Sequence, residues 1–185
     1  MSNRFPEQGT IWLTGASSGI GEALAKRLSA DGHSLIVTGR RQQPLDQLAE
    51  SGSGHVTPAP CDTTDPESLA SVREILELHR PVTMAILNAG TCEYLDVADF
   101  KSEIIEKNIT TNVIGTSRSI EAVLPALRDA RAKGHPATLV IVGSSAWWFP
   151  FGRAEGYGAS KAALAYLATS LRADLAAEGI DVVLV

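Results

Sequence analysis

A glycine-rich turn between an apolar strand and a helix constrains this chain more than any other feature of its sequence. Thr10–Thr14 (TIWLT) is a short apolar run that suits a buried parallel strand, and residues 20–30 follow with apolar side chains at helical spacing. Glycines in the turn between them let the backbone approach a pyrophosphate, whose charge then meets the N–H groups at the helix N-terminus. A tight loop without a ligand is the alternative, but the position between strand and helix favours a nucleotide. The predicted contacts are Gly15, Ser17, Ser18, Gly19, Ile20 and Gly21.

Strands and helices alternate from one end of the chain to the other. Apolar runs predict strands at Thr10–Thr14, Ser34–Thr38, within residues 51–60, and at 83–87, 137–142 and 181–185. Helical patterns occupy residues 20–30, 43–50, 65–79, 99–132 and 155–178, with Pro125 as a kink or break in the longest. Repeated βα units of this kind imply an α/β fold. We expect a single Rossmann-type domain over residues 1–185, with a doubly wound parallel sheet and helices on both faces.

Composition excludes several classes of protein. A net charge of −5 argues against a nucleic-acid partner, because phosphate binding relies on a surplus of Lys and Arg. No apolar run approaches the ~20 residues that span a bilayer, and the N-terminal MSNRFPEQGT lacks the features of a secretory signal. Cys61 and Cys92 show no metal-ligand spacing, so neither a metal site nor a disulfide is expected. The predicted location is the cytoplasm.

The residues after the second predicted strand bear on the kind of nucleotide. About twenty residues past such a glycine turn, NAD-binding domains usually place an acid that binds the adenine ribose hydroxyls. Here Ser34–Thr38 leads instead into Gly39-Arg40-Arg41. A guanidinium can bind a 2′-phosphate with paired hydrogen bonds, whereas an acid would repel it. We therefore expect NADP(H) rather than NAD(H), bound by Arg40 and Arg41. One of the two arginines can instead be a solvated loop residue; we favour Arg40 as the phosphate ligand, because it lies next to the vacated acid position.

Tyr157 and Lys161 form a candidate acid–base pair. They lie four residues apart on a predicted helix, so their side chains share one face. A phenol is a poor base near neutral pH because its unperturbed pKa is about 10, but a nearby ammonium favours the phenolate. A surface tyrosine with an unrelated lysine is the alternative.

Three motifs together resemble those of the short-chain dehydrogenase/reductase family. They are the turn TGxxxGxG, Asn88-Ala89-Gly90 after the fourth predicted strand, and Tyr157-x-x-x-Lys161 on a late helix. Each motif is weak alone, but all three stand at the family's elements in the family's order, and the similarity covers the whole chain. The resemblance implies an NADP(H)-dependent oxidoreductase that exchanges a hydride between nicotinamide and a carbonyl or alcohol substrate.

The resemblance also assigns further cofactor contacts. It implies that the Asp62 carboxylate, followed by Thr63, contacts the adenine amino group; the alternative for Asp62 is a turn or cap residue. It implies that Asn88, Ala89 and Gly90 support the sheet and let the ribose pass close to the backbone; a turn of small residues is the alternative, and the two are compatible.

The same resemblance assigns catalytic roles. Tyr157 would protonate the carbonyl oxygen in reduction, or act as the base in the reverse direction, and Lys161 would tune it and bind the nicotinamide ribose. Asn112 resembles the asparagine that distorts the long helix and holds a water in a proton relay. A mid-helix asparagine is otherwise mildly unfavourable, which supports a functional reason. The nearby Asn108 receives no role.

A hydroxyl donor is needed to polarise the carbonyl, and two adjacent serines follow the fifth predicted strand. Side chains of neighbouring strand residues point to opposite sides, so only one of Ser144 and Ser145 can face Tyr157. The family's serine commonly stands about thirteen positions before its tyrosine, which favours Ser144.

An aromatic run follows these serines. Four of the five residues in Trp147-Trp148-Phe149-Pro150-Phe151 are aromatic, in a chain where aromatic residues make up 5%. By resemblance this run borders the substrate and indicates a bulky or apolar carbonyl compound. Packing in the core or at a subunit interface is the alternative. The resemblance also implies a homodimer or homotetramer.

The family usually continues past the position of Val185 with a substrate lid and a seventh strand, so we expect the sequence to be C-terminally incomplete. Two other functions are open. One is a non-catalytic NADP(H)-binding or sensor protein of the same fold. The other is a sugar-nucleotide epimerase or dehydratase, although those relatives usually space their glycines as GxxGxxG.

Overall fold

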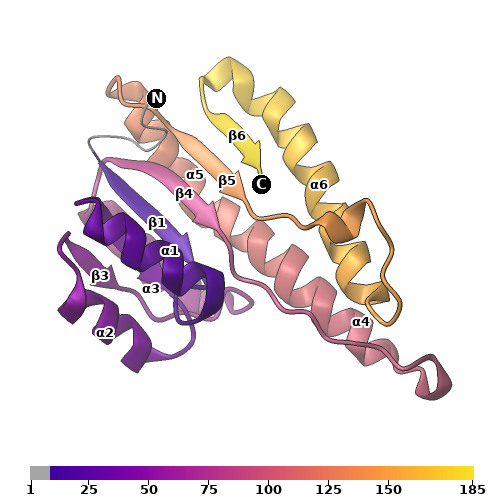
Figure 1. Cartoon of the computed structure of the whole chain (residues 1–185). Coiled ribbons are helices and arrows are strands. Elements are labelled where there is room, and N and C mark those ends of the chain that lie inside the picture. The colour runs from indigo at the N-terminus through magenta and orange to yellow at the C-terminus, as the bar shows by residue number, and fades with distance from the viewer. Residues whose placement is uncertain (1–8) are drawn as a thin grey trace.

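One parallel sheet forms the centre of the computed structural model, which describes residues 9–185 (Figure 1). Residues 1–8 lie outside the described part. Two predictions fall partly on them: the single domain over residues 1–185 and the absence of a secretory signal in the N-terminal segment. The strand order in that part is β3-β2-β1-β4-β5-β6. The bounds are β1 Thr10–Thr14, β2 Ser34–Thr38, β3 Val56–Pro58, β4 Val82–Leu87, β5 Thr138–Ile141 and β6 Asp181–Leu184. The predicted Rossmann-type sheet is confirmed.

Helices cover both faces of the sheet, as predicted (Figure 1). Alternate residues of each strand point to opposite faces: Trp12 packs in one apolar cluster, whereas Ile11 and Leu13 pack in the other. The first cluster includes residues of α3, α5 and α6, and the second includes residues of α1 and α2. The helices are α1 Gly19–Ala30, α2 Gln42–Ser51, α3 Pro66–Leu78, α4 Ser102–Ile109, α5 Gly115–Ala132 and α6 Glu155–Leu175.

The long helix predicted over residues 99–132 is interrupted around Asn112, the residue for which the family resemblance implied a distortion of this helix. A π-helical turn, Thr110–Ile114, separates α4 from α5 there. Of the kink or break predicted at Pro125, the break is wrong, because α5 continues through that residue. Pro125 and Glu121, whose carbonyl loses its helical partner, are both exposed, so water can replace the missing hydrogen bond.

The strand order creates a crevice beside β1 and β4. These strands are neighbours, yet α1 after β1 covers one face and α5, which follows β4 through α4, covers the other. Ligands of open α/β sheets bind where the chain leaves neighbouring strands toward opposite faces, at their carboxyl ends. Both the glycine turn and Asn88-Ala89-Gly90 stand at that edge. Within residues 9–185, no helix combines the length and apolar character needed to cross a bilayer.

Two leucines in helices test the apolar clusters. Leu28 in α1 is fully buried, whereas Leu78 at the end of α3 is 82% exposed. We expect Leu28→Ala to lower the free energy of unfolding by about 2–5 kcal/mol, because it removes buried apolar surface and leaves a cavity. Leu78→Ala should change it by no more than about 0.5 kcal/mol. Urea unfolding followed by circular dichroism measures both, and equal losses would contradict the assignment of Leu28 to the core.

Candidate functional site

The glycine turn lies in backbone contact with the segment that follows β4. Gly15 has φ +70°, and a Cβ there would lie 2.8 Å from Cα of Ala89. The Asn88 side-chain amide donates to the carbonyls of Thr14 and Gly15 at 3.2 and 3.3 Å. The Thr14 hydroxyl in turn accepts the backbone N–H groups of Asn88 and Ala89, both at 3.1 Å. A side chain at Gly15 would separate the two segments, so the turn requires glycine there.

A groove of about 790 Å³ starts at this turn and runs across the carboxyl ends of the strands to α6. It is lined by most of the predicted site residues, which come from five separate segments of the chain. These are Gly15, Ser17, Ser18, Ile20, Arg40, Asp62, Thr63, Asn88, Ala89, Gly90, Tyr157 and Lys161.

Three predicted cofactor residues lie outside the lining of the groove. Gly19 begins α1 with φ +58°, and Gly21 is buried beneath the turn. Arg41 donates from Nη2 to the carbonyl of Ser17 at 2.7 Å and so supports the turn from outside. Of the two arginines, Arg40 is therefore the one that lines the groove.

Asp62 lies at the same end of the groove as Arg40. Its carboxylate accepts hydrogen bonds from the backbone N–H and the hydroxyl of Thr64, at 2.9 and 2.7 Å. Burial alone would raise the pKa of Asp62, but the bonds from Thr64 and the positive charge of Arg40 lower it overall. Asp62 thus both forms a turn, which was the alternative for it, and presents an ionised carboxylate at the groove.

Lys161 and Tyr157 occupy the other end of the groove. Lys161 is only 5% exposed; its Nζ donates to the Val142 carbonyl at 2.8 Å and lies 5.7 Å from the centroid of the Tyr157 ring. Burial lowers the pKa of Lys161. The carbonyl at the end of β5 therefore holds the amine beside the half-buried phenol.

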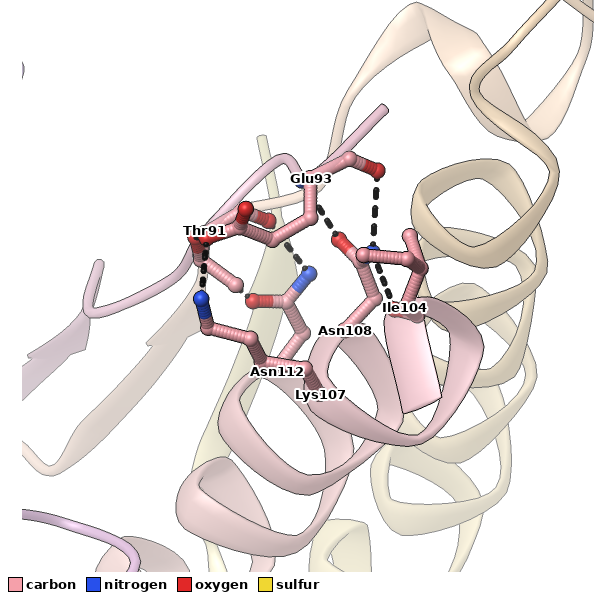
Figure 2. Close-up of polar contacts among 6 residues, drawn as sticks. All are labelled: Thr91, Glu93, Ile104, Lys107, Asn108 and Asn112. Atoms are coloured by element: carbon pink, nitrogen blue, oxygen red, sulfur yellow. Dashed lines mark hydrogen bonds and ion pairs between the residues drawn. The ribbon is translucent and has the colours of Figure 1, made fainter. Parts of the chain in front are cut away.

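Asn112 lies in the π-helical turn and is completely buried. Its Oδ1 accepts from the Thr91 N–H at 2.7 Å, and its Nδ2 donates to the Thr91 carbonyl at 2.9 Å (Figure 2). The same Nδ2 donates to the Ser160 hydroxyl at 2.8 Å, which donates to the Tyr157 carbonyl at 2.7 Å. Asn112 thereby joins the segment after β4 to α6 between Tyr157 and Lys161.

The two serines after β5 differ in their surroundings. Ser144 is half-buried and accepts the backbone N–H of Ala146 at 3.1 Å, as the cap of the 3-10 turn Ser145–Trp147. Ser145 is exposed. Neither serine is among the residues that line the groove in the described part of the chain, so the choice of Ser144 stays a prediction.

The groove also contains residues that the sequence did not indicate. Thr91, Cys92 and Glu93 continue its wall past Gly90. A polar stripe on the α4 side adds Glu103, Glu106, Lys107 and Thr110, and its spacing of three or four residues is the signal that could have revealed it. Glu93 pairs with Lys107 at 2.8 Å, and this hydrogen-bonded contact lowers the pKa of Glu93.

The aromatic run is not part of the core. Trp147, Trp148, Phe149 and Phe151 are all exposed, and the two tryptophan rings lie against each other with centroids 4.5 Å apart. The core-packing alternative is therefore wrong. Two interpretations of this run remain: it borders the substrate site, or it forms a subunit interface.

Comparisons with known proteins agree with the geometry. A family model described as short chain dehydrogenase matches residues 9–185. The chain is 36% identical over 181 residues to Sulfoacetaldehyde reductase 2 of Chromohalobacter salexigens, covering 93% of this chain and 69% of that protein. It is 32% identical over 167 residues to the NADP-dependent 3-hydroxy acid dehydrogenase YdfG of Salmonella typhimurium, covering 89% and 66%. A solved short-chain dehydrogenase from Sphingobium yanoikuyae in complex with NADPH superposes with a TM-score of 0.82 at 30% identity, over 96% of this chain and 69% of that one.

The contact beneath the turn can be tested at Gly21. A Cβ at Gly21 would overlap the Gly15 carbonyl and lie 2.6 Å from the Asn88 amide. We expect Gly21→Ala to lower the free energy of unfolding by about 1–3 kcal/mol, because α1 or the turn must shift. At Gly152 no atom lies within 4 Å of the added carbon, so Gly152→Ala is the matched control and should be nearly neutral. Thermal unfolding compares the two, and a neutral Gly21→Ala would refute the close contact.

Proposed function

Because the chain belongs to the short-chain dehydrogenase family, we propose that it is an NADP(H)-dependent oxidoreductase whose acid–base pair is Tyr157 and Lys161. Membership of the family makes it an oxidoreductase that transfers a hydride to or from a small-molecule substrate. The finer proposal is carried by one observation. Tyr157 and a buried Lys161 stand together at one end of the groove whose other end holds the glycine turn.

The groove and the start of α1 beside it fit a dinucleotide. At Gly19 an added Cβ would meet no atom within 4 Å, which leaves open space at the N-terminus of α1 for a pyrophosphate. At Gly90 a Cβ would lie 3.1 Å from Oδ1 of Asn112 and 3.8 Å from Nζ of Lys161, so glycine keeps the approach to that amine open. When bound, the nicotinamide supplies or accepts the hydride.

Charge at the phosphate end supports NADP(H) over NAD(H). The exposed Arg40 lines the groove at the position where an acid would select NAD, and it lies close enough to lower the pKa of Asp62. In this proposal Arg40 binds the 2′-phosphate and Asp62 accepts from the adenine amino group. Arg41, already bonded to the Ser17 carbonyl, supports the turn and so assists binding indirectly.

In the proposed mechanism, each catalytic side chain transfers a proton, stabilises a charge or polarises the carbonyl. The Tyr157 hydroxyl protonates the carbonyl oxygen in reduction and takes the proton back from the alcohol in the reverse direction. Lys161 stabilises the phenolate and binds the nicotinamide ribose. The Ser144 hydroxyl polarises the carbonyl. Asn112 holds the π-helical turn to α6. In the proposal it also holds a water beside Lys161, through which protons pass between the site and solvent.

Two observations point to different classes of carbonyl substrate. The sulfoacetaldehyde reductase and the 3-hydroxy acid dehydrogenase similar to this chain are named for small acidic compounds. The exposed aromatic run at residues 147–151 favours a bulky or apolar carbonyl compound instead. A substrate panel should therefore contain both kinds. A homodimer or homotetramer and a cytoplasmic location stay predictions.

Tyr157→Phe tests the chemistry, because it removes the hydroxyl while keeping the ring. We expect NADPH-dependent reduction of aldehydes and ketones, followed by NADPH absorbance, to fall by at least about 10²–10⁴-fold. NADPH binding, followed by fluorescence, should survive. Turnover at the parental rate would refute the role of Tyr157, and a parent protein that binds NADPH but reduces no member of the panel would favour a sensor.

A pair of adjacent arginine variants tests the choice of cofactor. Arg40→Ala should raise the Kd for NADPH about ten- to hundredfold and the Kd for NADH by less than about threefold, because only NADPH carries the 2′-phosphate. Arg41→Ala is the matched control and should affect both nucleotides alike through the Ser17 contact. Fluorescence titration measures the Kd of each variant for NADPH and for NADH. An equal rise of both Kd values in Arg40→Ala would overturn the preference for NADP(H).

A further inference from the structure

The segment over residues 91–95 follows Asn88-Ala89-Gly90 after β4 and runs beside α4 (Figures 1 and 2), and its residues 91–93 form one wall of the groove. It belongs to no strand, yet its odd-numbered residues are paired through both backbone groups. Thr91 exchanges two hydrogen bonds with the Asn112 amide. Glu93 does the same with the Asn108 amide, which accepts the Glu93 N–H and donates to the Glu93 carbonyl, both at 3.1 Å (Figure 2).

The third odd-numbered residue, Leu95, is paired with the loop before α6. Its N–H donates to the Arg153 carbonyl at 2.8 Å, and Nε of Arg153 lies 3.5 Å from the Leu95 carbonyl. Arg153 is the only residue other than glycine with a positive φ, +67°, in the described part of the chain. The strained backbone of Arg153 is thus held in place at the end of the same segment.

The spacing of the two asparagines matches the spacing of the segment. In an edge pairing, alternate residues of a strand exchange hydrogen bonds with their neighbour. Residues two apart in an extended chain are separated by about 6.6 Å, and helical residues four apart by about 6 Å along the axis. Asn108 and Asn112 therefore meet Glu93 and Thr91 in register, with helix and segment antiparallel. Their side chains replace a neighbouring strand.

Asn108 also contacts the start of α6, directly before Tyr157. At Gly156 an added Cβ would lie 3.2 Å from Nδ2 of Asn108 and 2.9 Å from Cα of Ile105. Asn108 is completely buried, and its second amide proton is donated to the Ile104 carbonyl at 2.8 Å. One amide thus links α4, the wall of the groove and the approach to Tyr157. Among the described residues that line the groove, Asn108 is absent, so it acts through others.

We propose that Asn108 is a positioning residue for the reaction: with Asn112 it fixes residues 91–95 in register and so sets the wall of the groove that faces Lys161 and Tyr157. The inference rests on the proposed function for its catalytic consequence. An amide suits the position because it offers an acceptor to Glu93 N–H and donors to two carbonyls. Alanine would leave all three of these partly buried backbone groups without this partner.

Amide hydrogen exchange of the whole chain, resolved by residue with NMR, tests the register without requiring activity. In the parent, the amides of Thr91, Glu93 and Leu95 should exchange at least about tenfold more slowly than that of Cys92. Asn108→Ala should speed exchange at Glu93 at least about tenfold, while amides of β1 keep their protection. Ser119→Ala is the control, because it removes a buried hydrogen bond to Gly115 in α5 away from this segment. It should leave Glu93 protected.

Kinetics test the positioning role. Asn108→Ala should lower kcat/KM for the carbonyl substrate about tenfold and change the Kd for NADPH by less than about threefold, because the glycine turn and Arg40 are untouched. Ser119→Ala should leave both constants near the parental values. Glu93 exchange unchanged by Asn108→Ala, or kinetics indistinguishable from those of Ser119→Ala, would overturn the inference. Turnover retained by Tyr157→Phe would overturn the proposed function while leaving the exchange result in place.

Discussion

The site depends on the close approach of two backbone segments at the centre of the sheet. Gly15 and Ala89 lie so near each other that a Cβ on Gly15 would stand 2.8 Å from the Ala89 Cα. The sheet order makes this contact possible, because β1 and β4 are adjacent although two strands and three helices separate them in sequence. The Asn88 amide then holds the contact through the Thr14 and Gly15 carbonyls. If the two segments separated, the floor of the groove would be lost, and Arg40 and Tyr157 would no longer border one site.

The two ends of the groove are built in different ways. The end at the glycine turn consists of exposed backbone and an exposed charge on Arg40. The end at Tyr157 is backed by buried polar side chains, of which Asn108, Asn112, Ser160 and Lys161 each have hydrogen-bond partners. Buried polar groups that are fully paired favour one geometry over its alternatives, because any shift leaves a group without a partner. That difference suits a site that binds a large anion at one end and aligns reacting atoms at the other.

Sequence patterns predicted the features that depend on neighbours along the chain. Five strands of the described part agree with prediction to within about one residue at each end, and β3 lies within the predicted stretch 51–60, because apolar runs and turn residues define them locally. Features made by contacts between distant segments were not predicted. The distortion of the long helix at Asn112 came from the family resemblance and not from helical periodicity, and its π-helical form was not foreseen. Asn108 was given no role, because its hydrogen bonds go to a segment fifteen residues away. Position in the sequence favoured Arg40 over Arg41, and Arg40 lines the groove; the bond from Arg41 to the Ser17 carbonyl, however, became visible only in the fold.

Burial of Lys161 has two opposed consequences for the proposed chemistry. A charge in a site of low dielectric acts more strongly on its neighbours, so in the proposed mechanism a buried ammonium stabilises negative charge on the reacting atoms more than a solvated one would. The same burial lowers the pKa of Lys161, which makes the ammonium easier to lose as pH rises. The Val142 carbonyl offsets part of this loss, because it accepts from the charged amine at 2.8 Å. In the proposed mechanism, the depth of Lys161 therefore strengthens the electrostatic action of its ammonium and at the same time makes that charge easier to lose at alkaline pH.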